Sequence, residues 1–238
     1  MRELSPAQRH KARVLAEQAA ASAEPGSPTT GSQYELQLYQ LAEDRRRLHA
    51  LQSVKSKIAL KAQLLPNYHA WVDGVLAAGK GGQDDVFATV LVWSIDAGEY
   101  ERAVQMAHYA VTHKMTLPDQ YKRDIPTMLV DEFSVAYLHG TLAEDPALAI
   151  KVLALIGNLT DSSDVPDQAR AKLYKALGYA QLVLADGDDN KRDLAGQARV
   201  YALAAHSSLQ HALSLFQGVG VKKDIEILER RLKKAEQG

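Results

Sequence analysis

The stretch from Gly79 to Lys114 constrains the fold most, because its apolar residues recur at the spacing of two consecutive helices. Residues three or four positions apart give the first helix one broad apolar face: Val86, Phe87, Val90, Leu91 and Trp93. After Gly98, a second helix has a smaller buried side: Tyr100, Ala103, Val104, Ala107, Ala110 and Val111. Alanines on that side allow close approach of the two helices. We predict an antiparallel helical hairpin over 84–113 in the core.

The rest of the chain shows the same helical spacing, and no segment alternates apolar and polar residues as a strand does. The pattern predicts further helices over 5–21, 34–65, 67–78, 127–139, 146–156, 167–185, 194–217 and 222–235. The expected fold class is therefore all-α, a helical bundle of antiparallel hairpins with a long basic N-terminal helix. The hairpins at 84–113 and 167–217 are also weakly tetratricopeptide-like, although the full repeat signature is absent.

Composition changes along the chain suggest four segments. Residues 1–33 form a basic arm, with a short helix followed by a flexible linker at 22–33 that is rich in Ser, Gly, Pro and Thr. Residues 34–66 form the long helix, which Pro66 ends. We expect residues 67–160 to be the central helical core, and residues 161–238 to be a C-terminal hairpin with a final amphipathic helix.

A net charge of −1 conceals an asymmetry along the chain. Residues 1–66 hold ten Lys and Arg against six Asp and Glu, and residues 222–238 hold six against four. The middle, residues 67–221, holds twelve against nineteen. Basic ends around an acidic middle suggest that the ends contact any polyanion.

The long helix has two contrasting faces. Apolar residues seven positions apart (Tyr34, Leu41 and Leu48, then Leu51, Ile58 and Leu65) give a coiled-coil-like pattern that could pair two chains or pack within one. The other face is basic: Arg45, Arg46, Arg47, Lys55, Lys57 and Lys61. Most charged helix faces are merely solvated, but phosphate contact is comparably plausible here. On the arm, the further candidate phosphate contacts are Arg9, Lys11 and Arg13.

Catalytic signals are weak. Gly79 to Gly82 lacks the spacing of a phosphate-binding loop. We predict that this segment ends one helix and precedes the next. Asp73, Asp84 and Asp85 could serve a magnesium-dependent nuclease, but Asp84 and Asp85 are adjacent and point about 100° apart on a helix. We expect both in the first turn of that helix, where negative side chains suit the helix dipole. Without cysteines, thiolate sites and disulfides are excluded. We expect no metal site, no cofactor and no catalytic residues, with the three aspartates and magnesium as the alternative.

Five segments together resemble the small terminase subunit of P2-like tailed bacteriophages, often labelled the terminase endonuclease subunit. They are SPAQRH, LLPNYHAWVDGVLAAGKGGQDD, VLVWSIDAGEYERAVQMAHYA, DVPDQARAKLYKALG and GVKKDIEILERRLK. The GKGGQDD segment, between Trp71 and Trp93, is the most specific part.

The resemblance implies a role in packaging viral DNA, which makes the nine basic residues named above on the arm and the long helix the candidate DNA contacts. A small subunit of this kind binds the packaging site on double-stranded DNA, assembles as a homo-oligomeric ring and recruits a large ATPase and nuclease subunit. The lack of a nucleotide-binding loop agrees with a motor on another chain. Two alternatives remain: an endonuclease in its own right, and a helical scaffold that does not bind DNA. With no apolar run that could span a membrane and no secretory signal, we expect the protein in the host cytoplasm, with no membrane partner.

Overall fold

The computed structural model describes residues 5–119, 121–187 and 194–235 and divides the chain into two compact units, Met1–Ile125 and Pro126–Gly238. Within the described residues all regular structure is helical, apart from one isolated bridge between Pro28 and Gln83. The predicted all-α helical bundle is confirmed. The likeness to tetratricopeptide stacking and the division into four segments stay predictions.

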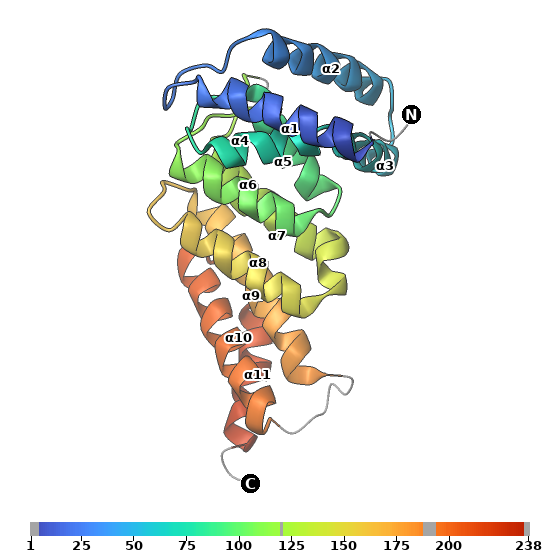
Figure 1. Ribbon diagram of the computed structural model, residues 1–238. Helices are drawn as coiled ribbons and strands as arrows, with labels where there is room; N and C mark the ends of the chain where they lie inside the picture. The colour runs from blue at the N-terminus through green and yellow to red at the C-terminus, as the bar shows by residue number, and fades with distance from the viewer. Residues whose placement is uncertain (1–4, 120, 188–193, 236–238) are drawn as a thin grey trace. The chain divides into compact units, whose positions relative to one another are not determined.

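The described part of the first unit contains six α-helices and one 3-10 turn, and Figure 1 shows their arrangement. They are α1 (Pro6–Ala21), α2 (Ser32–His49), α3 (Val54–Leu64), η1 (Leu65–Asn67), α4 (His69–Ala78), α5 (Asp85–Asp96) and α6 (Tyr100–Thr112). The predicted hairpin is confirmed as α5 and α6, which pack together. Gly98 lies in the connection with a positive φ of 83°, a conformation that glycine adopts without strain. Every α5 residue from Val86 to Ile95 is buried, so this helix forms the centre of the unit.

The predicted single helix over 34–65 is wrong: α2 ends at His49 and α3 begins at Val54. Basic side chains in the last turn of α2 suit the negative end of its dipole. Ser53 then caps α3 by accepting a hydrogen bond from the Ser56 amide. These two capping signals end one helix and begin the next, although residues 50–53 include no glycine or proline. Tyr34, Leu41 and Leu48 are buried within the unit, so this part of the coiled-coil-like pattern packs inside one chain.

The prediction of a tethered N-terminal arm is also wrong, because α1 packs along α4 (Figure 1). Ala16 and Ala20 are its buried residues, and Ala16 lies against Gly74 of α4. A methyl group on Gly74 would come within 2.5 Å of the Ala16 Cβ and 2.6 Å of the Arg13 carbonyl oxygen. Small residues thus allow the two backbones to approach, which compensates for the scarcity of large apolar side chains in α1.

Gly74→Val is expected to displace α1 and to lower the free energy of unfolding by about 2 kcal/mol, as overpacking of a close contact does. Urea unfolding measures the loss, and trypsin cleavage after Lys11 and Arg13 reports release of α1. Ala77→Val, at an exposed position of the same helix, is the control for a β-branched side chain in α4; helix propensity alone would make it the less stable of the two variants, because valine is a worse helix former than alanine and a better one than glycine. Equal stability of the two variants would contradict the proposed contact.

The expected flexible linker at 22–33 is instead bonded to the segment that follows α4. The amides of Gly26 and Thr29 donate to the carbonyl oxygens of Gly81 and Gln83, at 2.9 and 2.8 Å. The Gln83 amide donates in return to the Ser27 carbonyl oxygen at 2.8 Å. Composition alone could not show this pairing, because it joins segments more than fifty residues apart.

The second unit contains α7 (Ile125–His139), η2 (Thr141–Glu144), α8 (Pro146–Leu159), α9 (Asp167–Asp186), α10 (Gly196–Leu215) and α11 (Lys222–Ala235). The longest contact is between α9 and α10, where Gly178 lets Leu209 pack against the α9 backbone. Ile225, Leu228 and Leu232 are the buried residues of α11, which packs on α10. Among the described helices of the chain, none has the length and apolarity needed to cross a membrane.

Candidate nucleic-acid interface

The nine predicted DNA contacts do not lie on one helix face. Arg9, Lys11 and Arg13 are exposed on α1, whereas the other six are divided between α2 and α3 by the break at residues 50–53. Arg46, Arg47 and Lys55 are exposed, and Arg45, Lys57 and Lys61 are half-buried. The docking of α1 on α4 and the contacts of α2 with α1 and α3 place all three helices in one unit.

Three of the nine cations are neutralised by carboxylates. Arg46 pairs with Glu43 at 2.7 Å, Arg47 pairs with Asp44 at 2.8 Å, and Lys61 pairs with Asp96 of α5. The sequence has no acid between Arg45 and Leu65, but the acids that pair with the two arginines lie just before that stretch. The other six make no ion pair within the described part of the chain: Arg9, Lys11, Arg13, Arg45, Lys55 and Lys57.

Arg47 has a structural role that sequence reasoning missed. Its partner Asp44 is buried, with 5% of its surface exposed, and also accepts a 2.8 Å hydrogen bond from the Tyr68 hydroxyl. Burial, together with this hydrogen bond to Asp44, raises the pKa of Tyr68. The arginine thus compensates a buried carboxylate. The i, i+3 spacing of Asp44 and Arg47 was the available signal.

Asp84, one of the three alternative catalytic residues, is fully buried at the start of α5. Its Oδ1 accepts a hydrogen bond from the Phe87 amide at 2.8 Å, and its Oδ2 accepts one from the Trp71 indole at 2.8 Å. Burial raises the pKa of Asp84 to about 6, although these two donors favour the charged form and oppose the shift. Tyr34 stacks on Trp71, with the two ring centroids 5.9 Å apart. This carboxylate caps the central helix, as the sequence predicts for the first turn.

The other two alternative residues have separate protein partners. Asp85 accepts a 3.3 Å hydrogen bond from the Gln83 side-chain amide, and its own amide donates to the Tyr34 hydroxyl at 3.0 Å. Asp73 accepts a 2.6 Å hydrogen bond from Arg102. Across residues 5–119, 121–187 and 194–235, no three His, Asp or Glu side chains are grouped so that they could hold a metal ion.

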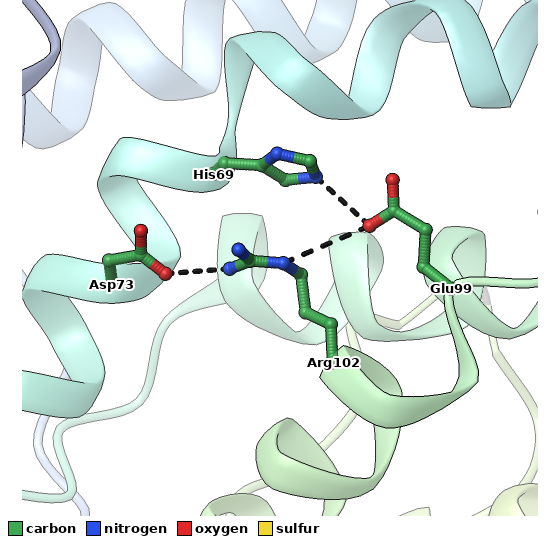
Figure 2. A network of polar contacts seen from close by, with 4 residues as sticks. All are labelled: His69, Asp73, Glu99 and Arg102. Atoms are coloured by element: carbon green, nitrogen blue, oxygen red, sulfur yellow. Dashed lines mark hydrogen bonds and ion pairs between the residues drawn. The ribbon is translucent and has the colours of Figure 1, made fainter. Parts of the chain in front are cut away.

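Figure 2 shows that Asp73 belongs to a polar network between α4 and the start of α6. Arg102 bonds Asp73 and lies 3.9 Å from Glu99, which in turn contacts the His69 Nε2 at 2.9 Å. The spacing signal was present in the sequence, with His69 and Asp73 four residues apart on α4 and Glu99 and Arg102 three apart. The four partly exposed side chains tie the two helices together.

The glycine-rich segment after α4 uses its amides within the protein. Gly79 ends α4 in the left-handed conformation, with φ at 62°. The Gly81 amide donates to the Tyr109 hydroxyl at 2.8 Å, while the Gln83 amide bonds to Ser27. The Gln83 side chain makes two further 2.9 Å hydrogen bonds with the backbone of Thr116. Because these amides are bonded within the protein, the segment serves to end α4 and to connect it to α5, as its spacing indicates.

Comparisons with known proteins identify the family. The sequence model described as "Phage small terminase subunit" matches residues 38–168. The chain is also 39% identical over 229 residues to the "Terminase, endonuclease subunit" of Escherichia phage P2, covering 96% of this chain and 86% of that protein. No solved structure matches the chain. The matched residues begin within α2 and end at the start of α9, and thus include the basic residues of α2 and α3 and the central hairpin. The chain belongs to the phage small terminase subunit family.

Proposed function

We propose that this terminase subunit binds double-stranded viral DNA at the packaging or cohesive-end site and delivers it to a large ATPase and nuclease subunit. The observation that carries the proposal is the set of six cations on α1, α2 and α3 with no ion pair among the described residues. Lys and Arg side chains free of acidic partners release counterions from DNA when they contact its phosphates, which is a main source of affinity. Such contacts position a protein on DNA without reading its sequence.

A gel-shift assay tests this function. The purified chain is titrated onto a duplex carrying the viral end sequence and onto a scrambled duplex of equal length, across a range of salt concentrations. We expect retention of both duplexes at low salt and of the viral end alone as salt rises, because only base contacts survive screening of the phosphate contacts. If no complex is retained at low salt, the result would contradict the proposal and favour the alternative, a helical scaffold that does not bind DNA.

We further propose that the chain assembles with copies of itself through the outward face of α2 and α3. Leu36 and Tyr39 lie three residues apart on α2, with 61% and 68% of their surfaces exposed, and Val54 on α3 is 71% exposed. Large apolar side chains grouped on a surface favour contact with another protein. The coiled-coil-like residues Tyr34, Leu41 and Leu48 are turned inward and leave this other face for a second copy.

Replacing Leu36 and Tyr39 with arginine is therefore expected to lower the mass of the particle in solution, toward that of a single chain. Light scattering coupled to size-exclusion chromatography measures this mass for the wild type and the variant at equal concentration. Leu155→Arg, at a position on α8 with 43% exposure, is the matched control and should leave the mass unchanged. An unchanged mass for the α2 variant would show that another face makes the contact.

An endonuclease is the second candidate function, because the phage P2 relative carries that word in its name. Under this alternative the purified chain nicks DNA with magnesium, and Asp73, Asp84 or Asp85 serves the metal. Asp73→Asn and Asp85→Asn are the informative variants, since both side chains are partly exposed whereas Asp84 caps a buried helix. We favour the recognition role, in which the large subunit cuts, and place it in the host cytoplasm during phage assembly.

A further inference from the structure

The last helix of the second unit has an outer face that none of the proposed contacts uses. Five cations on α11 are exposed and make no ion pair within the described residues: Lys222, Lys223, Arg230, Lys233 and Lys234. At 100° per residue, Lys223, Arg230 and Lys234 fall within about 40° of one another, directly opposite the buried residues Ile225, Leu228 and Leu232. At 1.5 Å per residue, these three extend over about 16 Å of the helix.

The acids of α11 are mostly turned toward neighbouring helices. Asp224 accepts a 2.8 Å hydrogen bond from the Tyr179 hydroxyl of α9, and Glu229 contacts the His206 ring of α10 at 2.9 Å. The inward cation Arg231 pairs with Asp186 of α9 at 2.6 Å. Only Glu226 among the acids of this helix lies exposed near the five outward cations without such a partner. Contacts with α9 and α10 thus engage Asp224, Glu229 and Arg231. The outer face of α11 is therefore positively charged, although the helix contains both acidic and basic residues.

We propose that this outer face of α11 is a second contact for the phosphate backbone of double-stranded DNA. The inference rests on the proposed function and extends it to the second unit, where the basic end of the sequence suggests polyanion contact without naming residues. A protein interface would favour aromatic anchors at its centre and few lysines, whereas the central positions here are Lys223, Arg230 and Lys234, with Ile227 as the apolar neighbour. Extended rows of Lys and Arg on an open surface are typical of phosphate contacts, which position the protein without reading sequence.

The test uses the full chain and a fluorescently labelled duplex of random sequence, with anisotropy measured across salt concentrations. The α11 variant carries Lys223→Gln, Arg230→Gln and Lys234→Gln. Its binding constant is expected to fall roughly tenfold or more at low salt, and the slope of log K against log salt to become shallower by about 2 to 3, since each lost phosphate contact removes about 0.9. A charge-preserving variant with Lys223→Arg and Lys234→Arg should bind as the wild type does.

Lys80→Gln, Lys114→Gln and Lys151→Gln form the matched control, because these three exposed lysines change the net charge equally without belonging to α11. An α11 variant that matches this control in affinity and slope would overturn the proposal and leave an acidic protein surface as the partner. A parallel variant with Arg45→Gln, Lys55→Gln and Lys57→Gln separates the proposed DNA binding by the first unit from the α11 contact. If it alone weakens binding, the proposed function stands and the α11 contact fails. If only the α11 variant weakens binding, the α11 contact stands.

Discussion

Neutralising the six cations of α1, α2 and α3 that make no ion pair with described residues is expected to remove most of the affinity of the chain for duplex DNA. The variant replaces Arg9, Lys11, Arg13, Arg45, Lys55 and Lys57 with glutamine. If each contacts one phosphate, the slope of log K against log salt becomes shallower by about 5, and the binding constant near physiological salt falls by a factor of roughly a thousand. Anisotropy titrations with a viral-end duplex measure both quantities.

The two halves of this set serve as internal controls. The α1 triple and the α2–α3 triple should each account for about half of the change in slope, whereas the control triple at Lys80, Lys114 and Lys151 should change it little. Circular dichroism and thermal unfolding establish that each variant keeps its helices. A six-residue variant whose slope equals that of the control would refute the assignment of these cations to DNA.

Arg47 is deliberately left in place in this design. A variant with glutamate at positions 45, 46 and 47 would reverse the densest basic run of the sequence, but Arg47 bonds the buried Asp44. Reversing that charge would leave Asp44 beside another carboxylate and destabilise the Tyr68 contact. Loss of DNA binding in such a variant would then report damage to the fold as readily as loss of a phosphate contact.

The second large effect is the pH dependence of stability that arises from Asp84. Its pKa is about 6 in the folded chain and 3.8 in the absence of the fold. The folded state therefore holds this proton more tightly, so the stabilisation is fully present below about pH 4 and is lost as pH rises through about 6. A shift of this size corresponds to about 3 kcal/mol, and the carboxyl is fully buried, so solvent does not screen it.

Urea unfolding of the wild type and of Asp84→Asn at several pH values between 4 and 7.5 isolates this effect. Asparagine can still accept the hydrogen bond of the Phe87 amide, but it does not titrate. The difference in the free energy of unfolding, wild type minus variant, should decrease by about 2 kcal/mol between pH 4 and 7, most of the full effect. Parallel profiles for the two proteins would show that Asp84 does not titrate in this range.

Local sequence patterns predicted those parts of the fold that depend on residues close together in the chain. The helix over 222–235 was predicted with the bounds that the structure has, because three apolar residues mark one side of a strongly charged helix. The hairpin of α5 and α6 followed from dense apolar spacing on both sides of Gly98. Asp84 was predicted in the first turn, and the structure makes it the N-cap.

Features that depend on contacts between distant segments were missed. The docking of α1 requires Gly74 to lie opposite Ala16, and the hydrogen bonds of residues 26–29 require the segment after α4 beside them. The ion pairs of the candidate site were missed for the same reason, since a run of basic residues in the sequence does not show that Lys61 pairs with Asp96. Sequence reasoning identified the cations, and the structure shows which six of them have no ion pair among the described residues.

In the proposed function, this chain binds viral-end DNA and leaves the cutting to another subunit. The most direct test incubates the purified chain alone with an end-labelled viral-end duplex and magnesium, isolates the retarded complex from a native gel and analyses its DNA on a denaturing gel. We predict a retarded complex that contains only full-length strands. Cleaved strands produced by the wild type and lost in Asp73→Asn or Asp85→Asn, or no retarded complex at all, would contradict this claim.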